Sequence, residues 1–258
     1  MRLRPKLLLS ISIAVLTCAG LISLGVWQLE RRVWKLELIE RVTRRVHAPP
    51  EPAPGPDAWS SLAAKNAEYR HVRLSGRWLN DRNTLVKAVT ELGGGYWVLT
   101  PLHTADGFTV LVNRGFVPTE YRNLQTRGDH GVNGTGESRH DITVTGLLRL
   151  SEPGGAFLRH NDPHADRWYS RDVAAIASTH GLNAATTAPY FVDADASVAG
   201  TVDTDTVDAG TVDTGNRSPV GGLTVIHFHN NHLVYAITWF SLALMPVAFI
   251  LITIRREQ

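Results

Sequence analysis

Residues 7–26 read LLLSISIAVLTCAGLISLGV and residues 233–254 read LVYAITWFSLALMPVAFILITI, and neither stretch contains a charged residue. A helix needs about 20 consecutive apolar residues to cross the hydrocarbon core of a bilayer. Both stretches have this length, so the sequence predicts two transmembrane helices. A cleavable signal peptide is the alternative for the first stretch. The apolar run is longer than usual for such a peptide, and no small-x-small cleavage site follows it, which favours a permanent anchor.

Basic residues flank the two predicted spans. Arg2, Arg4 and Lys6 precede the first, while Arg255 and Arg256 follow the second. The positive-inside rule therefore predicts cytoplasmic tails at residues 1–6 and 255–258, with the middle of the chain outside the cytoplasm. Six further basic residues follow the first span, but they belong to a long domain, for which the rule is weak. We expect a multi-pass protein of the cell (plasma) membrane.

Composition excludes several classes of partner and site. The net charge is +2, and no basic stripe is interleaved with aromatic residues, so nucleic acid is not expected as a partner. Cys18, the single cysteine, lies in the first apolar stretch. A disulfide framework and a thiolate metal site are therefore not expected.

The middle of the chain indicates a mainly β (α+β) extramembrane domain. Residues 27–56 are expected to form a juxtamembrane helix and a Pro-rich linker, and residues 57–232 the domain. Alternating or apolar runs predict strands at residues 72–76, 96–102, 109–112, 142–150, 190–192 and 223–229. Residues 93–95, Gly-Gly-Gly, are expected to form a turn or loop. Asp172 is expected to cap a short helix at residues 173–180, with Gly181 after its end.

Residues 193–215 differ from the rest of the domain. Thr-Val-Asp recurs from positions 201, 206 and 211, Asp is the only charged residue type, and aromatic residues are absent. Such a segment cannot bury a core, so we expect a disordered acidic insertion. A calcium loop is the alternative, but this spacing of carboxylates does not match a known ligand pattern.

No catalytic motif stands out in the sequence. GxSxG, HExxH, the P-loop and GxGxxG are all absent. The chain is therefore not expected to be an enzyme.

A histidine cluster precedes the second span. His227 and His229 would face the same side of a strand, and solvent-facing polar residues at a strand–helix junction are their simplest interpretation. His232 lies at the first turn of the membrane helix, where a neutral imidazole could serve as an axial ligand of heme iron. Tyr235 and Trp239 follow at i+3 and i+7 on the same face. Trp27, an interfacial aromatic residue of the first helix, completes the candidate cofactor-binding set.

The chain also resembles a known family, the Surfeit locus protein 1 family of cytochrome c oxidase assembly factors. The resemblance is carried by residues 24–31 (LGVWQLER), 34–35, 38–39, 72–76, 95–102, 110–118 (VLVNRGFVP), 221–222 and 231–240 (NHLVYAITWF). Each piece alone is weak, but their order within a two-span frame is specific. Residues 127–140 and 193–215 depart from the family pattern.

The resemblance implies a role in maturing the heme-bearing subunit of a heme-copper oxidase. It implies heme a as a cofactor, His232 as the iron ligand, and heme a synthase as a further partner beside the oxidase subunit. Two rivals remain open at this point. One is a cofactor-free scaffold that stabilises an oxidase intermediate, and the other is a copper or zinc site built from His227, His229 and His232. A membrane-anchored hydrolase is weaker, since no nucleophile can be named.

Overall fold

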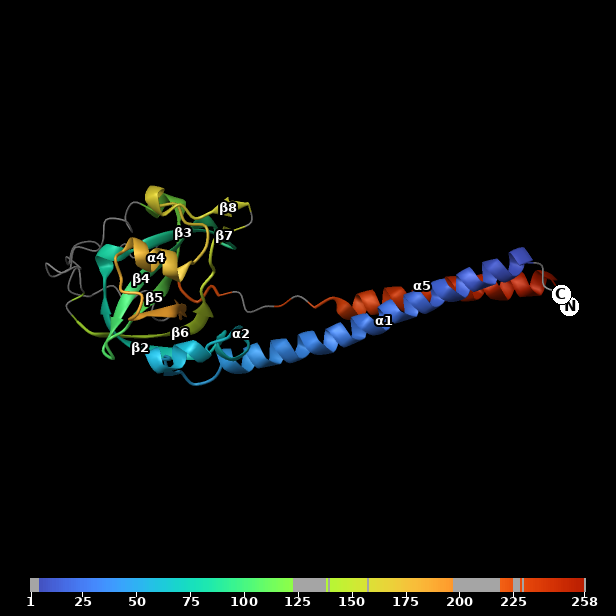
Figure 1. The fold of residues 1–258 in the computed structure, drawn as a ribbon, viewed down its shortest axis with the longest axis horizontal. Coiled ribbons are helices and arrows are strands. Elements are labelled where there is room, and N and C mark those ends of the chain that lie inside the picture. Colours follow the sequence, from blue (N-terminus) through green and yellow to red (C-terminus); the bar gives the residue numbers. More distant parts are fainter. Residues whose placement is uncertain are drawn as a thin grey trace. The chain divides into compact units, whose positions relative to one another are not determined.

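The computed structural model describes residues 5–122, 138, 140–156, 158–196, 219–224, 228 and 230–257. The chain divides into two units, one formed by residues 1–43 and 226–258 and the other by residues 44–225. The first unit holds two long helices, and the second holds a β-rich domain (Figure 1).

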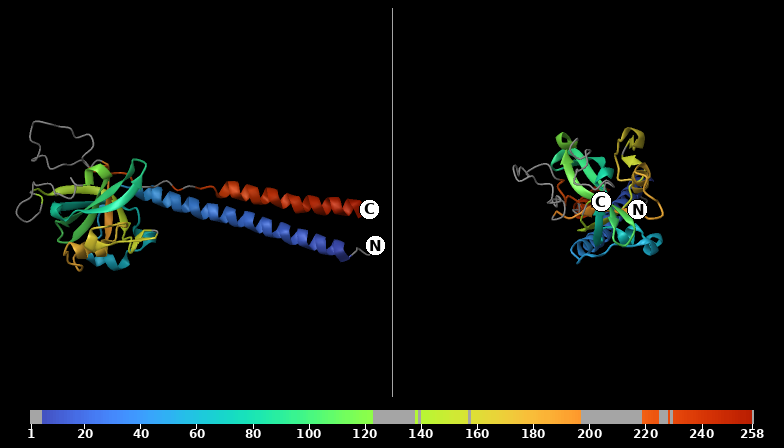
Figure 2. Two further views of the ribbon diagram at one scale, coloured as in Figure 1. Left: turned by 90° about the horizontal axis from the view of Figure 1, so that it is seen from above. Right: turned by 90° about the vertical axis from the view of Figure 1, so that its left-hand side faces the viewer.

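The first unit is an antiparallel pair of helices, α1 (Pro5–Val46) and α5 (His232–Glu257) (Figure 2). Both are long and apolar enough to cross a membrane, as predicted. Cys18 Sγ lies 3.6 Å from the carbonyl oxygen of Ala243. Gly25 lies against Phe240, and a Cβ on this glycine would come 2.5 Å from the phenyl ring. Small residues thus allow the two backbones to approach closely, as is common between membrane helices.

The second unit is built on one highly curved sheet. Neighbouring strands follow the order β2 (His71–Trp78), β6 (Ile142–Leu150), β9 (Thr187–Ala194), β5 (Thr109–Pro118) and β4 (Gly93–Thr104). β4 also pairs with the end of β2, which closes these strands into a barrel. β5 and β9 are parallel, and the other neighbours in the ring are antiparallel. β3 (Thr84–Thr90) extends from β4, and β1 (Glu51–Pro52) from β2.

The β domain also contains short helices and a small hairpin. They are the α-helices α2 (Ala64–Ala67) and α4 (Val173–Thr179), the hairpin of β7 (Gly155–Ala156) and β8 (Arg159–His160), and the 3-10 helices η1 (Pro56–Ser61), η2 (Asn80–Arg82), η3 (Thr119–Tyr121) and η4 (Pro163–Ala165).

The buried apolar side chains form three clusters, of which the smallest consists of Leu85, Val98 and Val117. Inward residues of the barrel, such as Val72, Leu148 and Tyr190, form the inner core. Outward residues such as Phe191 pack beneath α4, where Ile176 is fully buried, and form the second core. The alternation of side chains along a strand places the residue after Val192, Asp193, on the outer face of β9.

Several predicted elements are confirmed. Residues 142–150 match β6, and residues 72–76, 96–102, 109–112 and 190–192 lie within β2, β4, β5 and β9. The short helix is α4, and its predicted cap is present, because the Asp172 carboxylate accepts a hydrogen bond from the Ala175 N–H at 3.1 Å. Gly181 follows with a positive φ of 63°.

Other predictions are wrong. Gly93, Gly94 and Gly95 are not a turn or loop but the first residues of β4, paired with the end of β3. Residues 223 and 224 are not part of a strand. Asp193 does not begin a disordered insertion, because it pairs with Asn113 inside the sheet and is 4% exposed. Residues 197–215 of the expected insertion lie outside the described residues, as do His227 and His229.

Candidate functional site

Gln28 and His232 face each other across the helix pair. The Nδ1 atom of His232 lies 2.8 Å from the Oε1 atom of Gln28. An amide oxygen only accepts hydrogen bonds, so the imidazole donates from Nδ1. In a neutral ring the lone pair then resides on Nε2, the atom that remains for another partner. Within the described residues, Nε2 forms no hydrogen bond.

The other three predicted cofactor-binding residues lie around this pair in different settings. Trp27 and Tyr235 are 53% and 55% exposed in the helix pair, so their rings point away from the interface. Trp239 is partly buried, and its Nε1 atom is buried without a hydrogen-bond partner. The same is true of the Oδ1 atom of Asn230, just before α5. The structure therefore brings His232 together with Gln28, which the sequence did not single out.

The predicted metal alternative gains no support from the part of the chain that the structure describes. No group of three or more His, Cys, Asp or Glu side chains could hold a metal ion there. His232 is the only member of the predicted triad among these residues.

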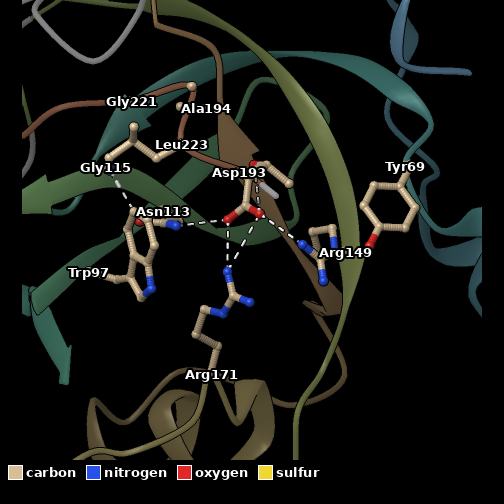
Figure 3. Close-up of a pocket in the computed structure, with 12 residues that line it drawn as sticks. Tyr69, Trp97, Asn113, Gly115, Arg149, Arg171, Asp193, Ala194, Gly221 and Leu223 are labelled. Carbon is tan, nitrogen blue, oxygen red and sulfur yellow. Dashed lines mark hydrogen bonds and ion pairs between the residues drawn. The ribbon is translucent and has the colours of Figure 1, made fainter. Parts of the chain in front are cut away.

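A second site lies in the β domain, in a cavity of about 340 Å³ on the outer face of the barrel (Figure 3). Asp193 forms its floor. The carboxylate accepts hydrogen bonds from Asn113 Nδ2 at 2.7 Å, Arg171 Nη1 at 3.1 Å, Thr224 Oγ1 at 3.1 Å and Arg149 Nη1 at 3.3 Å. Donors from two strands, β5 and β6, and from two connecting segments thus converge on one buried carboxylate.

Each of the two arginines is also held by a second carboxylate. Arg149 Nε donates to Glu68 at 3.0 Å, and Arg171 forms a bidentate pair with Glu152 at 2.6 and 3.1 Å. Burial lowers the pKa of Arg149, but Asp193 and Glu68 outweigh it and raise that pKa above its ordinary value. Burial raises the pKa of Glu152, while its bonds to Arg171 outweigh this effect and lower it. Arg149 and Glu152 are therefore both charged at neutral pH.

Residues 219–224 form one wall of the cavity. Val220 exchanges two backbone hydrogen bonds with Phe116, each of 2.9 Å. This approach requires Gly115, whose φ is 133° and whose Cβ, if present, would collide with the Val220 carbonyl. Two stretches that carry the family resemblance, residues 110–118 and 221–222, therefore meet at this cavity although about a hundred positions separate them.

Sequence patterns did not reveal this second site. Asp193 follows a short apolar run and opens an Asp-rich stretch, which hid its place at the end of β9. The available signal was the period of two along residues 190–193, because it puts Asp193 on the face opposite Val192. Pairing it with Asn113 further requires that β5 and β9 be parallel neighbours, which is a property of the fold.

The chain is similar to proteins of one family along most of its length. The model of the SURF1 family matches residues 15–244, a range that includes Gln28, Asp193 and His232. Surfeit locus protein 1 of Rattus norvegicus is 35% identical over 237 residues, which cover 85% of this chain and 67% of that protein. The Homo sapiens protein of the same name is 34% identical, with 85% and 69% covered, and a SURF1-like protein of Caenorhabditis briggsae is 29% identical, with 87% and 69% covered. The chain therefore belongs to the SURF1 family.

Proposed function

We propose that this protein is an assembly factor of a heme-copper (cytochrome c type) terminal oxidase. It holds heme a at the outer boundary of the membrane and assists its insertion into the heme-bearing subunit, without catalysing a reaction. Membership of the SURF1 family supports the link to the oxidase, and the helix pair supports the cofactor.

One observation carries the cofactor proposal, the hydrogen bond between His232 and Gln28. Histidines that bind metals through one ring nitrogen usually donate from the other to an acceptor, which fixes the tautomer and the orientation of the ring. The 2.8 Å contact between Nδ1 and Gln28 Oε1 supplies this arrangement and leaves Nε2 for iron. Heme would supply an iron with an open axial position for this nitrogen.

The surroundings of His232 also suit a ligand. Buried polar atoms without partners are rare in proteins, and they often mark a group that a ligand completes. Among its described residues, the helix unit contains two, Trp239 Nε1 and Asn230 Oδ1. Exposed Tyr235 and Trp27 add aromatic surface on the two helices.

The proposed location follows from the charge distribution around the two spans. Basic tails favour a multi-pass protein of the cell membrane with both termini in the cytoplasm and the β domain outside. The heme-bearing oxidase subunit would be met there, and heme a synthase is the proposed source of the cofactor.

Absorption spectroscopy of the purified protein tests the proposal. We expect a heme Soret band in the wild type and a lost or shifted band in His232→Ala, because the axial ligand is gone. His227→Ala and His229→Ala serve as controls and should keep the wild-type spectrum. Oxidase activity in cells should fall with His232→Ala, in part only, since a carrier raises the efficiency of insertion. Purified wild-type protein that contains neither heme nor metal would favour the cofactor-free scaffold. Bound copper or zinc without heme would favour the metal site built from His227, His229 and His232.

A further inference from the structure

The floor of the cavity in the β domain has no hydrogen-bonding capacity left for a ligand. Asp193 Oδ1 accepts from Asn113 and Arg171, and Oδ2 accepts from Arg149, Arg171 and Thr224. The side chain is 4% exposed. A carboxylate offers about four acceptor sites, so this one is saturated. Its role is to hold the two guanidinium groups in place beside the cavity.

Several hydrogen-bond donors of the lining residues have no partner among the described residues. Arg149 uses Nε and Nη1 for its two carboxylate partners, and Nη2 has no partner among the described residues. The same holds for Trp97 Nε1 and for the backbone N–H groups of Gly221 and Leu223, which belong to residues that line the cavity. Figure 3 shows Trp97 and Arg149 on opposite sides of Asp193, with Arg171 approaching from the segment before α4.

These donors determine which ligand chemistry fits. Hydrogen bonds from guanidinium, indole and backbone N–H groups are strongest to the oxygens of an anion. The carboxylates of Asp193, Glu68 and Glu152 already accept from the arginines and from backbone N–H groups, which makes them poor ligands for an added cation. The five charged side chains sum to −1, so the directed donors, and not the total charge, provide the selectivity.

The position of Arg149 adds to this selectivity. Its guanidinium stacks on the Tyr69 ring at 4.8 Å, is bound on two edges by Glu68 and Asp193, and is therefore held in a single orientation. A donor that is already fixed loses little conformational entropy when a ligand binds.

The cavity has the size of a small-molecule site. Its volume of about 340 Å³ is near the lower end of the range for ligand pockets in proteins. The Trp97 ring and the Leu223 side chain provide apolar wall beside the donors. We propose that this cavity binds a small molecule through an oxyanion head group, a carboxylate or a phosphate, with Arg149 Nη2 and Trp97 Nε1 as the principal donors.

NMR on the full-length protein in detergent micelles tests this site. The indole N–H resonance of Trp97 is identified by its loss in Trp97→Phe, and it is then followed during titration with sodium phosphate and, separately, with sodium succinate at constant ionic strength. We expect a saturable shift with at least one of the two anions. Saturation by phosphate alone identifies a phosphate site, and saturation by succinate alone identifies a carboxylate site.

Arg149→Lys is the decisive variant, because lysine keeps the positive charge beside Asp193 and Glu68 but loses the Nη2 donor. It should weaken binding about ten-fold or more, the effect of one lost hydrogen bond to a charged group. Arg167→Lys is the matched control, since Arg167 pairs with Asp162 on the surface and does not line the cavity. If Arg149→Lys fails to fold, the anion-induced rise in melting temperature of Trp97→Phe is compared with that of the wild type, and a smaller rise is expected.

The proposal is overturned if the Trp97 resonance responds to both anions as weakly and linearly as to chloride. It is equally overturned if Arg149→Lys, or in its place Trp97→Phe, binds as tightly as the wild type. His232→Ala should retain the full response, because His232 belongs to the helix pair. Loss of heme binding and loss of anion binding are thus separate results.

Discussion

At the scale of single residues, Asp193 contributes most to the organisation of the β domain. It is buried on the outer face of β9 and bonds to both arginines of the cavity. Removing one partner of a buried ion pair leaves the others uncompensated in a poorly solvated site.

Asp193→Ala should therefore lower the free energy of unfolding of the β domain by about 3–5 kcal/mol. For a domain of this size the melting temperature should fall by about 10 °C, measured by differential scanning calorimetry. Asp141→Ala is the control, because Asp141 forms an exposed pair with Arg77 and such pairs contribute little. Equal melting temperatures for the two variants would contradict the role given to Asp193.

His71 makes the stability of the domain depend on pH. Its Nδ1 lies 2.8 Å from the carbonyl oxygen of Ala48, and its Nε2 lies 2.9 Å from the Asp195 carboxylate. Burial lowers the pKa of His71, but these two acceptors together outweigh it and raise the pKa above 6.5. The protonated ring can donate to both partners, whereas the neutral ring can donate to only one.

The direction of this pH dependence follows from the difference in His71 proton affinity between the folded and unfolded states. The folded state binds the proton more tightly than the unfolded state, so the stabilisation is complete below the unfolded pKa and is lost as pH rises through the folded pKa. His180 has the opposite tendency, because burial lowers its pKa. The contribution of His71 is therefore measured by comparing the wild type with His71→Gln. Between about pH 6 and pH 8, the melting temperature of the wild type should fall relative to that of the variant. Parallel curves for the two proteins would rule out the proposed linkage.

At the scale of elements, the close contact between α1 and α5 positions Gln28 opposite His232. Gly25→Leu should force the helices apart, because a Cβ alone at this position would already lie 2.5 Å from the Phe240 ring. Oxidative cross-linking reports the change: with Ala243→Cys, a disulfide to Cys18 should form readily and should be lost when Gly25→Leu is added. Gly20→Leu is the control, since a Cβ at Gly20 meets no atom within 4 Å. A cross-link that survives Gly25→Leu would refute this packing.

The elements that could be predicted from sequence show a local pattern, either an alternation of buried and exposed residues, as in β2, or a short apolar run, as in β5. β2 alternates strictly, so residues 72–76 could be predicted as a strand, and the strand itself spans His71–Trp78. β3 was missed because it is buried on both sides over much of its length, so Thr84, Leu85 and Val86 show no alternation. Closure of the barrel was also beyond local patterns, because β2 and β4 meet at Gly76, where a Cβ would collide with the carbonyl oxygen of His103.

The same distinction between local sequence patterns and long-range contacts applies to the residues of the helix-pair site. His232 could be proposed from its place before an apolar span, which is a local feature. Its partner Gln28 is separated from it by 204 positions and is adjacent only because the helices are antiparallel in a specific register. Gln28 did carry a weak signal, as a polar residue two positions after the apolar stretch at residues 7–26.

At the scale of the whole molecule, the antiparallel pair places both ends of the chain on the same side of the proposed membrane. Basic residues near both ends favour the cytoplasmic side. In a Cys18→Ala background, Asp106→Cys lies in the exposed turn between β4 and β5 and should react with a membrane-impermeant maleimide in intact cells. Gln258→Cys should react only after lysis. The reverse pattern would invert the proposed topology.

Chemical rescue tests the proposal that His232 Nε2 is the axial ligand of heme. His232→Gly removes the imidazole, and free imidazole added to the heme-loaded variant can occupy the vacated position. We predict that His232→Gly shifts the Soret band and that imidazole returns it to the wild-type position, while the wild type itself does not respond. A His232→Gly spectrum identical to that of the wild type, or an imidazole effect of the same size in both proteins, would contradict the account.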